Sequence, residues 1–183
     1  MKKSILLVFL FCFLLSGCTG YREIERGYFV TAIAFSKSGE SVTVFVEAIF
    51  SSDVTNEKSE RVVLKSVGNS AKDAFESLET SLVKPLYLEH LGTILLENES
   101  VENIAFLKQI NGINGGACVV KTSDATTLFK NDSPSGILGY DIVNLIKKQN
   151  KKNNTKTTLY NADNPRLPTV DFKEETFILQ WNG

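Results

Sequence analysis

Residues 28–50 read YFVTAIAFSKSGESVTVFVEAIF and consist of two apolar runs on either side of a short polar loop. The loop contains Gly39, which can adopt the positive φ that a tight turn needs. Two runs rich in β-branched and aromatic residues around such a loop predict a β-hairpin. The first run is apolar on both faces, whereas the second alternates, so the first is expected to lie more centrally in its sheet.

The residues after the hairpin predict further strands and helices. Ser70 followed by Asp73 is typical of a helix capping box. Apolar residues then repeat at helical spacing as far as Pro85, which cannot continue a helix. Other strands are predicted at 60–67, 91–97, 116–122 and 176–181, and other helices at 101–110, 123–130 and 137–148. This order predicts an α/β (α+β) fold, with a mixed β-sheet and helices packed on it.

One polar segment stands out near the C-terminus. Residues 149–158, QNKKNNTKTT, have no apolar side chain to bury and predict a mobile, solvated loop. A second interpretation is contact between its lysines and anionic lipid headgroups, if the domain is held near a membrane.

The N-terminus is typical of a bacterial export signal. Lys2 and Lys3 precede an apolar run, residues 5–15, which would span only about 16 Å as a helix. That is too short for a membrane-crossing helix, which needs roughly 20 residues. Residues 15–18, Leu-Ser-Gly-Cys, resemble a lipobox, which implies cleavage before Cys18 and a diacylglyceryl group on its sulfur. The alternative is a plain secretory signal in which Cys18 is incidental.

These features divide the chain into a signal peptide at 1–17, a membrane-proximal linker at 18–27 and a single α/β domain at 28–183. The whole chain has a formal net charge of −1, and losing two leader lysines leaves −3, which does not suit nucleic-acid binding. Without the leader only Cys18 and Cys118 remain, so neither a disulfide framework nor a cysteine metal site is expected. Two acyl chains on Cys18 would anchor the protein stably to the outer face of the cytoplasmic membrane.

Catalytic groups are scarce in this sequence. His90 is the only histidine, and its neighbour Glu89 would point to the opposite face of an extended segment. Nucleophile-elbow and phosphate-loop motifs are absent. We therefore expect no catalytic residues, no metal and no cofactor besides the lipid on Cys18. His90 is expected to satisfy a backbone group at a strand start rather than act in catalysis or as a ligand.

Three stretches together resemble the Ger(x)C lipoproteins, the C subunits of spore nutrient germinant receptors. The first follows the lipobox and contains Arg-Glu-Ile-Glu at 22–25 before an apolar strand. The second joins a helix to a Leu-Tyr-x-x-His segment and a strand ending in Glu97. The third is ACVVKTSDATTLFK, residues 117–130. Two departures are that Thr19 and Gly20 stand where the family often has Trp-Asp, and that family members are longer, with further α/β domains. Whether this chain is a natural short version, a split product or a fragment is left open.

The resemblance implies a lipid-anchored, non-enzymatic receptor subunit at the spore inner membrane, acting in germination. Its partners would be membrane lipid, through Cys18, and the membrane-embedded receptor subunits. Arg22, Glu23 and Glu25 are the expected partner contacts, with a solvated linker as the alternative. Tyr87 and His90 are expected to be structural parts of the family signature. The other function classes are a ligand-binding lipoprotein that senses a germinant or solute, and a wall-acting hydrolase.

Overall fold

The computed structural model describes residues 27–51, 59–97, 105–110, 112–113, 115–153, 167–173 and 176–180. The strands are β1 (Tyr28–Ser38), β2 (Ser41–Ser51), β3 (Ser59–Gly68), β4 (Leu86–Tyr87), β5 (Thr93–Glu97), β6 (Cys118–Thr122), β7 (Thr169–Lys173) and β8 (Thr176–Gln180). The labelled helices are α2 (Ala71–Ser81), α4 (Ala125–Lys130) and α5 (Leu138–Asn153). Within these ranges, no helix is long and apolar enough to cross a membrane. Cys18, Arg22, Glu23 and Glu25 lie outside the described residues.

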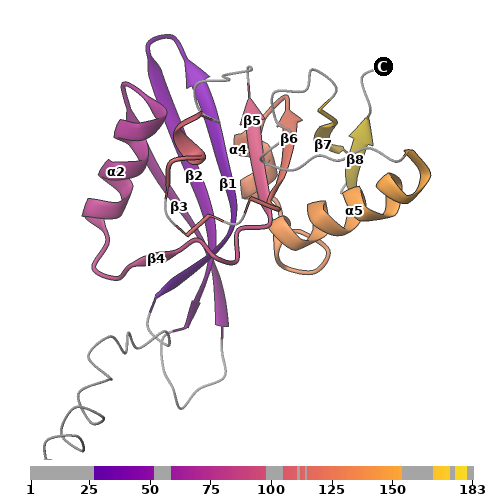
Figure 1. Ribbon diagram of the computed structural model, residues 1–183, viewed down its shortest axis with the longest axis horizontal. Coiled ribbons are helices and arrows are strands. Elements are labelled where there is room, and N and C mark those ends of the chain that lie inside the picture. Colours follow the sequence, from indigo (N-terminus) through magenta and orange to yellow (C-terminus); the bar gives the residue numbers. More distant parts are fainter. Residues whose placement is uncertain are drawn as a thin grey trace, which may run out of the picture.

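All eight described strands form one mixed sheet, in the order β3-β2-β1-β5-β6-β7-β8, with β4 paired to β1. The β1–β2, β2–β3 and β7–β8 pairs are antiparallel. The pairs that β1 makes with β4 and β5, and the β5–β6 and β6–β7 pairs, are parallel. Helices pack on this sheet, which confirms the predicted α+β class (Figure 1).

The predicted hairpin forms the centre of this arrangement. Gly39 has a φ of 61° in the turn between β1 and β2, which only glycine adopts at little cost. Residues 30–35 of β1 are all buried, because neighbouring strands flank β1 and helices cover both faces. The expectation that the first run is the more central strand is confirmed.

Each face of the sheet carries its own hydrophobic core. One core lies under α2 and includes Phe35, Phe75 and Ile94. The predicted cap of α2 is confirmed, since the Ser70 hydroxyl accepts a hydrogen bond from the Asp73 N–H at 3.1 Å. The other core lies under α4 and α5 and includes Phe45. Both faces of β2 are therefore covered, although its alternating sequence indicated one apolar face.

Three elements differ from the expected pattern. Helix α5 continues to Asn153, into the segment predicted as a loop, because lysine and glutamine are good helix formers and no Gly or Pro interrupts them. Strand β4 has only two residues, too few to show periodicity. Strand β7 follows Pro168 and pairs mainly with β8, and its TVDFK sequence alternates polar and apolar residues over only five positions.

Candidate functional site

Tyr87 and His90, the two described residues of the expected family signature, lie together at one end of the sheet. Strand β4 runs parallel to the start of β1, which places Tyr87 opposite Phe29. The two rings stack with their centroids 5.3 Å apart. His90 is exposed and lies edge-on to Phe29 at 5.8 Å. Its imidazole makes this ring contact, and the expected bond to a backbone group stays a prediction.

Gly27 makes this packing possible. A Cβ at residue 27 would collide with the ring of Tyr87 and lie 3.1 Å from the carbonyl oxygen of Pro85. The Tyr28 N–H donates a hydrogen bond to that same carbonyl oxygen at 3.0 Å. Glycine is thus required by close approach, and the chain enters β1 directly beneath the Tyr87 ring.

More aromatic side chains lie at the same end of the sheet, on its other face and toward β2. Tyr28 lies opposite Phe50 in the β1–β2 register, and their rings are 5.0 Å apart. The Lys84 ammonium lies 4.4 Å from the centre of the Phe50 ring, within range of a cation–π attraction. Beside it, Val83 is 100% exposed. We call this region the aromatic end: Tyr28, Phe29, Phe50, Val83, Lys84, Tyr87 and His90. It lies where β1 begins and β2 ends, at the bottom of Figure 1.

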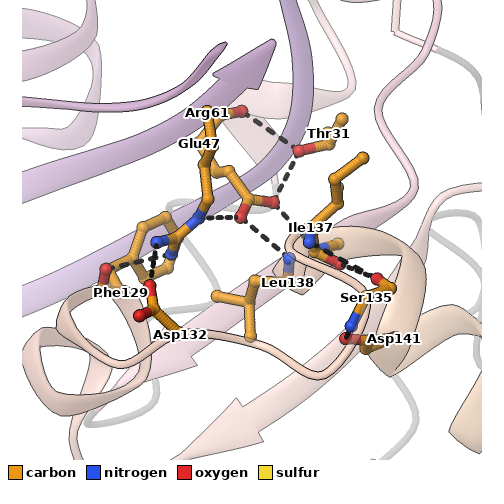
Figure 2. A network of polar contacts seen from close by, with 10 residues as sticks. Thr31, Glu47, Arg61, Phe129, Asp132, Ser135, Ile137, Leu138 and Asp141 are labelled. Atoms are coloured by element: carbon orange, nitrogen blue, oxygen red, sulfur yellow. Dashed lines mark hydrogen bonds and ion pairs between the residues drawn. The ribbon is translucent and has the colours of Figure 1, made fainter. Parts of the chain in front are cut away.

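A second polar centre lies in the middle of the sheet, and the sequence analysis missed it. Glu47 on β2 is 0% exposed, and its two carboxylate oxygens accept four hydrogen bonds (Figure 2). Oε1 accepts from Arg61 Nε at 2.7 Å and from the Leu138 N–H at 2.8 Å. Oε2 accepts from the Thr31 hydroxyl at 2.6 Å and from the Gly139 N–H at 2.9 Å. We call these five residues the Glu47 network.

The Glu47 network fixes the beginning of α5 to the sheet. The Leu138 and Gly139 N–H groups have no partner within the helix, and a carboxylate also suits the positive end of the helix dipole. A Cβ at Gly139 would collide with the Thr31 carbonyl oxygen, so the helix approaches β1 as closely as only glycine allows. Arg61 also donates to the Phe129 carbonyl oxygen at 3.0 Å, which ties the end of α4 to β3.

The Glu47 network therefore stabilises the fold, and its carboxylate presents no free oxygen to a ligand. Both carboxylate oxygens are saturated with donors, and the Glu47 side chain has no exposed surface. The signal that points to it is a lone acidic residue within the apolar run of β2. Elsewhere in the described ranges, no three His, Cys, Asp or Glu side chains gather closely enough to hold a metal ion.

Two carboxyl groups elsewhere have shifted pKa values. Hydrogen bonds from the Thr127 hydroxyl and N–H lower the pKa of Asp124, the N-cap of α4, below its ordinary value. Partial burial, followed by repulsion from Glu76, raises the pKa of Glu79. Asp124 caps α4 and Glu79 lies on α2, which fits a structural origin of both shifts.

The comparisons with known proteins agree with the sequence resemblance. The model of a family described as the spore germination protein N-terminal domain matches residues 20–164, which is more than half of the chain. Neither the comparison with curated proteins nor that with solved structures gives a match. The matched range contains both the aromatic end and the Glu47 network. The chain belongs to the family of the spore germination protein N-terminal domain.

Proposed function

We propose that this chain is a lipid-anchored, non-enzymatic subunit of a spore nutrient germinant receptor. The observation that carries the proposal is the family match, which begins at residue 20. Cys18, the last residue of the lipobox-like sequence, precedes that match by two residues. The proposed export signal, the proposed lipid acceptor and the germination domain thus follow one another closely along the chain.

The proposed mechanism is tethering. Two acyl chains hold a protein on a membrane far more stably than one. Confinement to the surface then raises the effective concentration of the domain near membrane-embedded partners. Arg22, Glu23 and Glu25 follow Cys18 closely, so they are the proposed contacts to those partners. The single sheet with a core on each face would act as the rigid body that the tether holds.

Crosslinking in isolated spore inner membranes tests this proposal. An epitope-tagged chain is crosslinked, captured through its tag and identified with its partners by mass spectrometry. The proposal predicts that receptor membrane subunits are captured, and that a Cys18→Ser variant captures none because it lacks the lipid. Membrane attachment without receptor subunits would contradict the receptor role and favour a lipoprotein that binds a germinant or solute. Isothermal titration with germinants would then examine that function.

A further inference from the structure

The two ends of the β1–β2 hairpin carry very different side chains. At one end, residues 37–41 comprise the turn and the strand residues beside it, and all five are exposed, with polar side chains apart from Gly39. At the other end, four aromatic rings are half-buried and Val83 is 100% exposed. Each strand has 11 residues, so the two ends lie about 35 Å apart at 3.3 Å per residue. The domain therefore has aromatic and apolar side chains at one end of the hairpin and polar side chains at the other.

The path of the chain before β1 indicates what the aromatic end contacts. Gly27, the first described residue, lies against the Tyr87 ring, within the aromatic end. Gly27 is nine positions after Cys18, and nine Cα-to-Cα steps span at most about 32 Å when fully extended. Because the chain enters the domain at the aromatic end, a lipid on Cys18 would draw this end toward the membrane surface, rather than the polar turn about 35 Å away.

The side chains of the aromatic end match the chemistry of a lipid headgroup region. Tyrosine rings are enriched at membrane interfaces, because one edge is apolar and the hydroxyl is polar. Lysine can extend its ammonium group into the headgroups while its alkyl stem stays in an apolar environment. Among the residues that the structure describes, two exposed carboxylates, Glu60 and Glu89, lie at the same end, so the charges described there do not favour the contact. Apolar and aromatic side chains must supply it.

We propose that the aromatic end sits in the headgroup region of the membrane, with Val83 as its deepest side chain. This inference rests on the proposed lipid anchor at Cys18. It adds an orientation, in which β1 and β2 stand on the membrane and the turn at residues 37–41 points away from it. The apolar and aromatic side chains supply this contact, since among the described residues Lys84 is offset by the two carboxylates.

Site-specific fluorescence on the full, lipid-modified chain tests this orientation. Cys118 is replaced by Ala, and a single cysteine is placed at position 83 (Val83→Cys) or, as the matched control, at position 40 (Glu40→Cys). Both positions are exposed, so a label at either leaves the fold intact. The bimane-labelled chains are reconstituted into vesicles of phosphatidylethanolamine and phosphatidylglycerol. Quenching is measured with aqueous iodide and with lipid that carries a nitroxide at its headgroup.

The expected result is that iodide quenches the label at position 83 several-fold less than the label at position 40, and that nitroxide lipid quenches position 83 alone. Equal access of iodide to both labels on vesicle-bound chain would overturn the orientation and leave the lipid anchor intact. Chain that stays in the supernatant would overturn the anchor, and the orientation with it. Shielding of position 83 only when receptor membrane subunits are added, without nitroxide quenching, would overturn lipid contact in favour of a protein partner.

Discussion

The Glu47 network and the aromatic end share strands β1 and β2, yet they are built for opposite surroundings. In the middle of β2, Glu47 has no exposed surface, and each carboxylate oxygen accepts two hydrogen bonds. At the end of the same strand, Phe50 is only half-buried, and Val83 nearby is fully exposed. The middle of the hairpin therefore stabilises the fold, whereas side chains at its end can contact a surface outside the domain.

Replacing Glu47 should have the largest effect on stability. In Glu47→Gln an NH₂ group replaces one carboxylate oxygen. This group is a hydrogen-bond donor, and the groups that it would face are donors too, so neither side would find an acceptor. Breaking a buried, paired charge in this way typically costs about 3 kcal/mol or more. We expect the free energy of unfolding, measured by urea denaturation, to fall by about 3 kcal/mol. The exposed Glu60→Gln on β3 is the control and should change stability by less than about 0.5 kcal/mol. Equal effects of the two variants would contradict the role of the Glu47 network.

Gly139→Ala should have the next largest effect. The added methyl group would meet the Thr31 carbonyl oxygen, which belongs to β1 and cannot move aside easily. Overpacking of this kind costs about 1–3 kcal/mol. Asn144→Ala, at an exposed position of the same helix, is the matched control. A Gly139→Ala protein as stable as this control would show that α5 is not held against β1 as closely as described.

Asp124 allows a smaller, pH-dependent test outside both regions. Asp124→Ala removes the N-cap of α4 and should cost about 1 kcal/mol at neutral pH, whereas Asp124→Asn keeps a capping oxygen. The Thr127 hydrogen bonds lower the pKa of Asp124 below 3.8 in the folded state, so its charge stabilises the fold above that pH. This contribution is lost as the pH falls below 3.8 through the folded pKa. The unmodified chain should therefore lose more stability than Asp124→Asn between about pH 4 and pH 2. Stability is measured by urea denaturation at each pH. If the two proteins lose the same stability between about pH 4 and pH 2, the stabilising role of the Asp124 charge is contradicted.

Val83→Asp should have the smallest effect on stability. The side chain is 100% exposed, and surface substitutions usually stay within about 0.5 kcal/mol. Its thermal unfolding should match that of the unmodified chain. A loss of more than about 1 kcal/mol would mean that the aromatic end belongs to the core, and the contrast between the two regions would disappear.

The sequence predicted the local elements well, because their signals are local. Gly39 indicated the turn, Ser70 and Asp73 indicated the start of α2, and the apolar character of residues 28–36 indicated a central strand. Strand β4 and the end of α5 were missed, since two residues show no periodicity and a polar helix resembles a polar loop.

The Glu47 network could not be predicted, because its members lie far apart in the sequence. Leu138 and Gly139 are 91 and 92 residues from Glu47, and alternation along β2 does not reveal that α4 and α5 cover its second face. Tyr87 and His90 were selected by family resemblance, and neither spacing nor composition indicated that both would contact Phe29. The anchor and linker residues, Cys18, Arg22, Glu23 and Glu25, stay predictions.

The most direct test of the central claim, that Cys18 anchors this domain to a membrane, is intact-protein mass spectrometry of the chain isolated from spore membranes. The account predicts a mature chain that begins at Cys18 and carries the mass of a diacylglyceryl group, with or without a further acyl chain on its amine. An unmodified N-terminus, or cleavage at any other residue, would contradict it.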